Sequence, residues 1–94
     1  MEISYTKTFA RDLRKIKQNY ILDKVSALKK TIELAKSVNE IKHLESIKGM
    51  KNAYRIRVGN YRIGVFIEKN NVEFHRIKLR KDIYKFFPLF QFIA

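Results

Sequence analysis

The sequence predicts an α+β domain in which two N-terminal helices pack on one face of a small, mainly antiparallel sheet. The first observation is the alternation of apolar and polar residues from Tyr54 to Val65 on both sides of Gly59-Asn60, which predicts a hairpin of two strands. The second is a pair of apolar stripes with helical spacing between residues 9 and 35. The expected order, βααβββ with a short terminal helix, is typical of α+β folds.

The N-terminal third predicts one strand and two helices. Residues 2–5 alternate and are rich in strand-forming types, and Thr6 or Thr8 can cap the helix that follows. The inner stripe of this first helix consists of Phe9, Leu13, Ile16 and Tyr20. The stripe of the second helix consists of Ile21, Val25, Leu28, Ile32 and Ala35. Because Asn19-Tyr20 interrupts the phase of the pattern, we expect two antiparallel helices joined by a tight turn.

The second half of the chain predicts a three-stranded meander. Residues 38–52 show no clear period, so we expect an irregular connection that ends in a turn at Gly49. The strands are expected at about 53–58, 61–68 and 72–78. Alternation fails between Phe74 and Ile77, which predicts a bulge, and Gly64 either marks a bulge or keeps a groove open.

Length and charge limit the possible functions. The 94 residues are expected to form one domain, residues 1–94, with a modest core. Lys and Arg number 21 against nine acids, giving a net charge of +12. Such a charge favours a phosphate backbone, an acidic protein or an anionic membrane as partner, in that order.

The residue types present exclude several kinds of site. The chain has no cysteine, which rules out disulfides and Cys-based zinc sites. His43 and His75 have no acid cluster beside them and the three glycines form no phosphate loop, so we expect neither a metal nor a cofactor. The N-terminus does not resemble a signal peptide and no apolar run reaches 18 residues, so we expect a cytoplasmic protein without a membrane span.

The polar face of the predicted hairpin carries Arg55, Arg57 and Arg62. Like charges on one face repel, and an anionic partner is the simplest reason to keep them together. The remaining chemistry is cleavage of RNA by its own 2′-hydroxyl, in which guanidiniums bind the scissile phosphate and stabilise its transition state. Since arginine cannot act as a base, Tyr84, His75 or a lysine would have to carry protons.

Three segments resemble the RelE/ParE superfamily of bacterial type II toxins: residues 48–50, 54–63 and 76–84. The resemblance covers roughly residues 3 to 88. It implies a toxin neutralised by a cognate acidic antitoxin. In the family, a RelE-like branch cleaves messenger RNA in the ribosome and a ParE-like branch poisons DNA gyrase. We favour a messenger RNA endoribonuclease, with a gyrase inhibitor or a catalytically silent RNA-binding module as alternatives.

The same resemblance implies the catalytic residues Arg55, Arg57, Arg62, Arg80 and Tyr84. Arg62 and Arg80 would hold the scissile phosphate, and Arg55 and Arg57 would stabilise charge. Tyr84 would stack on a base or assist proton transfer. Family members often have lysine in place of Arg55 and Arg57, and a lysine can become a base where an arginine cannot.

Other residues near the implied site are open to two interpretations. Leu79 occupies a position where many relatives have a histidine, so no general base is evident. Arg76 either joins the site or pairs with Glu73 or Glu68. His75 is expected to be a surface or packing residue.

The C-terminal segment is expected to form a helical turn over residues 82–87, which Pro88 ends. Six apolar residues crowd this end of the chain: Phe86, Phe87, Leu89, Phe90, Phe92 and Ile93. We expect Phe86 and Phe87 to close the core. Phe90 and Phe92 are expected to offer an apolar surface to an antitoxin helix.

Overall fold

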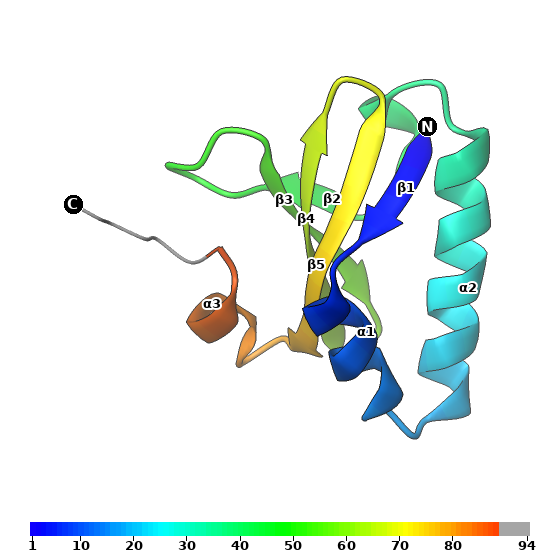
Figure 1. Ribbon diagram of the computed structural model, residues 1–94, viewed down its shortest axis with the longest axis vertical. Coiled ribbons are helices and arrows are strands. Elements are labelled where there is room, and N and C mark those ends of the chain that lie inside the picture. Colours follow the sequence, from blue (N-terminus) through cyan, green and yellow to red (C-terminus); the bar gives the residue numbers. More distant parts are fainter. Residues whose placement is uncertain (89–94) are drawn as a thin grey trace.

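The computed structural model describes residues 1–88 and shows a five-stranded sheet in the order β1-β5-β4-β3-β2 (Figure 1). The elements are β1 (Glu2–Tyr5), α1 (Lys7–Arg14), α2 (Asn19–Leu34), a 3₁₀ turn (Val38–Glu40), β2 (Leu44–Ser46), β3 (Ala53–Val58), β4 (Tyr61–Glu68), β5 (Asn71–Leu79) and α3 (Ile83–Phe86). β1 pairs with β5 in parallel, and the other neighbours are antiparallel. The predicted α+β class is therefore confirmed. The expectations for Leu89, Phe90, Phe92 and Ile93 lie outside the described residues.

The main core lies between the helices and one face of the sheet. Fully buried residues of this core include Ile21 and Ile32 from α2, and Ile56, Ile63 and Ile77 from the sheet. The predicted stripe of α2 is thus confirmed. The predicted stripe of the first helix is wrong at Tyr20, which is 55% exposed, because α1 ends at Arg14 and Tyr20 falls in the first turn of α2.

A strand absent from the sequence prediction forms the edge of the sheet. Residues 44–46 pair with β3, with Leu44 opposite Ile56 and Glu45 opposite Arg55. We expected residues 38–52 to be irregular, and this expectation is wrong for residues 44–46, which form β2. Three residues are too few to show a period. Residues 44–46 therefore form a strand because the edge of β3 offers them backbone partners, and not because of their own pattern.

A smaller core lies on the opposite face of the sheet, where Figure 1 shows α3 away from α2. It contains Ala53, Ile83 and Phe87, with Ile47, Met50 and Phe66 packed around them. The sheet is therefore covered on both faces near its centre. The predicted bulge is confirmed, because the register of β4 and β5 shifts between Gly64 and Val65 and leaves His75 as the extra residue.

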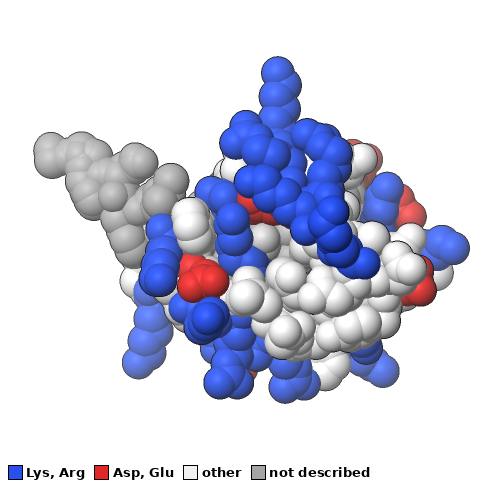
Figure 2. All heavy atoms as spheres, turned by 90° about the horizontal axis from the view of Figure 1, so that it is seen from below, with Lys and Arg blue, Asp and Glu red and all other residues white. Residues whose placement is uncertain are grey.

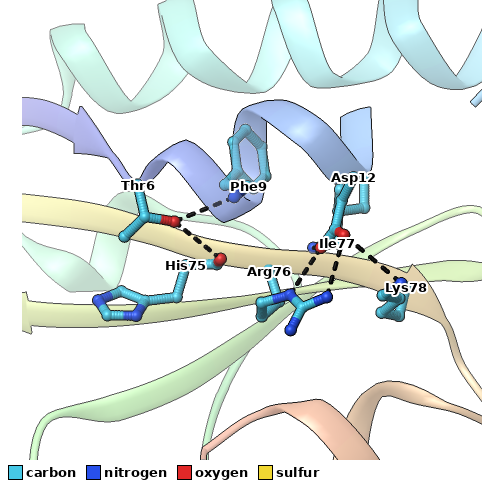
Figure 3. Close-up of polar contacts among 7 residues, drawn as sticks. All are labelled: Thr6, Phe9, Asp12, His75, Arg76, Ile77 and Lys78. Carbon is cyan, nitrogen blue, oxygen red and sulfur yellow. Dashed lines mark hydrogen bonds and ion pairs between the residues drawn. The ribbon is translucent and has the colours of Figure 1, made fainter. Parts of the chain in front are cut away.

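Beyond the end of β1, side chains at the start of α1 and within it hydrogen-bond to the exposed edge of β5. The Thr6 side chain caps α1 by accepting from the Phe9 amide at 3.0 Å, and it donates to the His75 carbonyl at 3.1 Å (Figure 3). Further along α1, the Asp12 carboxylate accepts a hydrogen bond from the Ile77 amide at 3.2 Å. Side chains of α1 therefore satisfy backbone groups that a longer β1 would have paired.

Asp12 is the buried charged residue of the described chain, with 4% of its surface exposed. Arg76 donates to its two oxygens at 2.8 and 3.1 Å, and the Lys78 ammonium lies 3.4 Å away (Figure 3). Arg76 therefore pairs neither with Glu73 nor with Glu68. Burial acts to raise the pKa of Asp12, but hydrogen bonds from Arg76 and Ile77 and the charges of Arg76 and Lys78 outweigh it and lower the pKa below its ordinary value of 3.8.

This lowered pKa makes stability depend on acid pH. A carboxyl with a depressed folded-state pKa stabilises the fold above its unfolded value, and that contribution disappears as the pH falls through the folded-state value. We expect the free energy of unfolding to fall as the pH drops below about 3.8, and Asp12→Asn to reduce this slope. Urea unfolding between pH 5 and pH 2 measures both. An equal slope in the two proteins would contradict the assignment.

Candidate active site

A hollow of about 380 Å³ opens on the face of the sheet opposite α1 and α2. Its lining consists of His43, Glu45, Arg55, Arg57, Arg62, Arg80, Ile83 and Tyr84. All five residues that the sequence analysis assigned to the site are in this lining. The structure therefore brings together residues that are 29 positions apart in the chain, from Arg55 to Tyr84.

Strand register explains why the arginines meet. Arg57 lies opposite Arg62 and Arg55 lies opposite Gly64, so the three guanidiniums project from the same face of β3 and β4. The turn between these strands needs positive φ, which Gly59 supplies at 59°. The Arg80 amide donates to the Asn60 carbonyl of this turn at 2.9 Å. This bond places the end of β5 beside the hairpin.

Each central arginine of the hollow is held by a defined partner. Arg55 pairs with Glu45 and lies over the Tyr84 ring, with its guanidinium carbon 5.6 Å from the ring centroid. Arg57 lies 2.9 Å from Nδ1 of His43. Arg62 donates to two carbonyls of the hairpin turn, at 3.1 and 2.9 Å. These contacts fix the guanidiniums in place before any ligand binds.

The hollow has a strong positive potential, since its lining has four guanidiniums and one carboxylate. Burial, followed by the charges of Arg80, Arg57 and Arg55, lowers the pKa of Arg62 from its ordinary value. Arg62 nevertheless remains a cation. On the face drawn in Figure 2, groups of Lys and Arg lie around an uncharged area, and few carboxylates lie among them. The arrangement suits a phosphate group, which would relieve the mutual repulsion.

Two residues of the hollow, His43 and Glu45, were missed by the sequence analysis. Both belong to the β2 region, which was expected to be irregular. The available signal was charge complementarity, because a strand at residues 44–46 beside β3 would place Glu45 across from Arg55. His43 has a positive φ of 65°, so the backbone turns sharply just before β2.

Other candidates lie outside the hollow. His75 contacts the Glu73 carboxylate at 2.8 Å and packs edge-on against Phe66, which confirms its expected packing role. Arg76 is occupied by Asp12. Of the three suggested proton carriers, Tyr84 lines the hollow, whereas His75 does not and the described lining contains no lysine.

The position of Tyr84 depends on α3, and α3 depends on a close approach to the sheet. The Phe87 ring lies directly on Gly64, where a Cβ atom would collide with ring carbons. Phe87 also contacts Phe66, with 5.0 Å between ring centroids. Gly64 therefore does more than mark the bulge: it lets the residue after α3 pack flat against β4.

A protein-family model described as "ParE toxin of type II toxin-antitoxin system, parDE" matches residues 3–84. The chain is also 37% identical over 89 residues to Toxin RelE3 of Methanocaldococcus jannaschii, an alignment that covers 94% of this chain and all of that protein. The chain belongs to the RelE/ParE superfamily. The expected family is thereby confirmed.

Solved structures of superfamily members have the same fold. The toxin in the RelB-RelE antitoxin-toxin complex from Methanococcus jannaschii matches with a TM-score of 0.76 and 36% identity, covering 90% of this chain and 99% of that one. The isolated E. coli RelE toxin matches with a TM-score of 0.62 over 89% of this chain and 90% of that one, and its 16% identity shows a shared fold alone. Within residues 1–88, no group of three potential metal ligands comes together, and no helix is long and apolar enough to cross a bilayer.

The contact between Gly64 and Phe87 predicts a stability effect. Gly64→Ala is expected to lower the free energy of unfolding by about 1–3 kcal/mol, because the added methyl group overpacks this position. On a Phe87→Ala background the same substitution should cost much less, because the clashing ring is gone. Urea unfolding of the four proteins measures this cycle. Equal costs on both backgrounds would show that Phe87 does not lie on Gly64.

Proposed function

We propose that this chain is the toxin of a type II toxin–antitoxin system and acts as a ribosome-dependent messenger RNA endoribonuclease that inhibits translation. The observation that carries the proposal is the convergence of four guanidiniums and the Tyr84 ring on one hollow. A scissile phosphate needs such cations, and an unstacked base suits an aromatic ring. The 37% identity to a protein named Toxin RelE3 supports the RelE-like branch.

The reaction proposed is attack by the substrate's own 2′-hydroxyl on the adjacent phosphorus. The 2′-oxygen forms a bond to phosphorus, the bond to the 5′-oxygen breaks, and the products end in a 2′,3′-cyclic phosphate and a 5′-hydroxyl. Arg62 and Arg80 hold the phosphate, and Arg55 and Arg57 offset the charge that develops in the transition state. Because the guanidiniums of Arg55, Arg57 and Arg62 are already held by protein groups, they need little reorganisation during the reaction.

Two groups of the β2 region, the Glu45 carboxylate and the His43 imidazole, are placed to act on the reacting oxygens. The 2′-hydroxyl must lose a proton, and the Glu45 carboxylate can accept it, because its pairing with Arg55 leaves other lone pairs free. The guanidinium of Arg57 can only donate, so the Nδ1 atom of His43 accepts from it. With Nδ1 accepting, the imidazole hydrogen lies on Nε2, where it can donate a hydrogen bond to the leaving 5′-oxygen. The proton that this oxygen takes up comes from solvent, and Glu45 returns the proton of the 2′-hydroxyl to solvent.

The proposed partners are a cognate acidic antitoxin, messenger RNA and the ribosome, and the proposed location is the cytoplasm, where translation takes place. A net charge of +12 suits both an acidic protein and RNA. The toxin from Methanococcus jannaschii, 36% identical to this chain, was solved in complex with its antitoxin RelB. An acidic antitoxin on this surface would compete with RNA for the same cations.

A ParE-like inhibitor of DNA gyrase is the second candidate, because the matching family model is described as a ParE toxin. Such a protein would act by binding and would need no proton carrier. The third alternative is a catalytically silent RNA-binding module. The lining of the hollow favours the ribonuclease over both, because it combines cations with an acid and an imidazole.

Removing a phosphate-binding cation should abolish activity. We expect Arg62→Ala or Arg80→Ala to lower cleavage at least about 10²-fold, as removal of one transition-state donor typically does. The measurement is induced expression in cells, with translation followed by labelling and RNA 5′ ends mapped within codons. Arg11→Ala on α1 is the matched control, because it removes the same charge far from the hollow.

The same experiment separates the candidates. Intact messages with an induced DNA-damage response would support gyrase inhibition and contradict the ribonuclease. Cleavage that Arg62→Ala and Arg80→Ala leave unchanged would place the activity elsewhere. If the unaltered protein neither cuts messages nor damages DNA, the silent module is favoured.

Removing the proposed proton acceptor should slow cleavage without weakening binding. Glu45→Gln is expected to reduce the single-turnover rate on programmed ribosomes by about 10²–10⁴-fold, the usual contribution of a general base. RNA affinity should stay the same or rise, because a negative charge leaves the hollow. Glu33→Gln on α2 is the control. An unchanged rate for Glu45→Gln would exclude Glu45 as the acceptor.

A further inference from the structure

Helix α3 carries Tyr84 but is too short to fix its own position. It spans four residues, and its N-cap Asp82 makes no side-chain capping bond. A single turn of helix is not stable in isolation, so its place is set by what it packs against. On one side Ile83 and Phe87 enter the smaller core. On the other side Phe86 lies on two cations of β5.

The Phe86 ring rests on Arg76 and Lys78. The guanidinium carbon of Arg76 lies 4.8 Å from the ring centroid, and the ammonium of Lys78 lies 4.5 Å from it. Both distances are within the range of cation–π attraction. Long basic side chains at a surface normally sample many rotamers. Arg76 and Lys78 therefore form a fixed surface for the Phe86 ring, here called the seat, only when another group restrains them.

Asp12 supplies that restraint. Its two oxygens accept from Nε and Nη2 of Arg76 and attract the Lys78 ammonium, and the Ile77 amide fixes one of the oxygens (Figure 3). The carboxylate is thus held by the backbone of β5 and in turn holds both cations. Burying a charge in this way adds little to stability compared with an apolar residue of similar size. A role beyond stability would account for it.

We propose that Asp12 is a positioning residue for the hollow: by holding Arg76 and Lys78 under Phe86, it fixes α3 and so keeps the Tyr84 ring against Arg55. The chain of contacts runs from α1, around the edge of β5, to the opposite face of the sheet. Asp12 itself is absent from the lining of the hollow. The activity arm of the test rests on the proposed function, whereas the spectroscopic arm does not.

The spectroscopic arm uses F86W. The chain has no tryptophan, so this substitution introduces a single fluorophore on the seat, and an indole ring binds cations better than a phenyl ring. Adding D12N should shift the emission to longer wavelength and increase quenching by acrylamide, because the freed cations no longer hold the ring. The control is I32V in α2, which lowers stability away from α3 and should leave both readings unchanged. Unchanged emission in F86W/D12N that is still folded would overturn the proposal.

The activity arm is a double-mutant cycle with Y84A, which removes the Tyr84 ring. D12N should lower the cleavage rate by about 10–100-fold, as a small misplacement of a catalytic group can, while RNA affinity falls less than twofold because the four arginines remain. In the Y84A protein, which lacks the ring, the further loss caused by D12N should be much smaller, because Asp12 acts by positioning that ring. Equal losses on both backgrounds would mean that Asp12 does not act through Tyr84, and would overturn the proposal.

Two further variants cover the case in which D12N does not fold. K78M keeps the apolar stem of Lys78 but removes its charge, and F86L keeps an apolar side chain but removes the ring. Both leave the pair of Asp12 and Arg76 intact. Each should lower the cleavage rate in the same direction as D12N, and a normal rate in both would overturn the proposal. If the unaltered protein cleaves no RNA, the proposed function fails, while the fluorescence of F86W with K78M still decides whether the seat holds α3.

Discussion

Repulsion among like charges is the constraint on which the rest of this structure depends. Arg55, Arg57, Arg62 and Arg80 share one hollow, and an isolated hairpin would not hold them there. Apolar packing on both faces of the sheet supplies the stability that makes this possible. The few acids are placed selectively: Glu45 orients one arginine inside the hollow, whereas Asp12 pairs with two cations outside it. Asp12 therefore neutralises part of the charge of Arg76 and Lys78, which lie outside the hollow, while the arginines inside it face a single carboxylate within the described lining.

The parts of this architecture that follow from local pattern were predictable. A period of two around Gly59-Asn60 is enough to place Arg55, Arg57 and Arg62 on one face, because register in a tight hairpin is set by the turn. Two features were not predictable in this way. β2 is too short to show a period, so His43 and Glu45 were missed with it. The pairing of Asp12 with Arg76 joins residues 64 positions apart, and sequence proximity wrongly suggested Glu73 or Glu68.

The acid and the imidazole of the hollow, Glu45 and His43, come from a different strand region than the sequence comparison with the family suggested. Leu79, at the end of β5, occupies the position where a histidine was expected, and it offers no proton-transfer group. His43 and Glu45 enter the hollow from β2, across the sheet from that position. Arg80, the residue after Leu79, lines the same hollow as His43 and Glu45, so both strand ends border one site. The identity of a proton carrier is therefore a property of the hollow rather than of one sequence position.

The parallel pairing of β1 with β5 has a consequence for how the protein is made. Residues 2–5 cannot find their partners at 71–74 until most of the chain has left the ribosome. Contacts this distant in sequence also slow folding, because a long loop must close first. A chain that is still being translated therefore lacks the pairing of β1 with β5, and with it one edge of the sheet, until residues 71–74 have emerged.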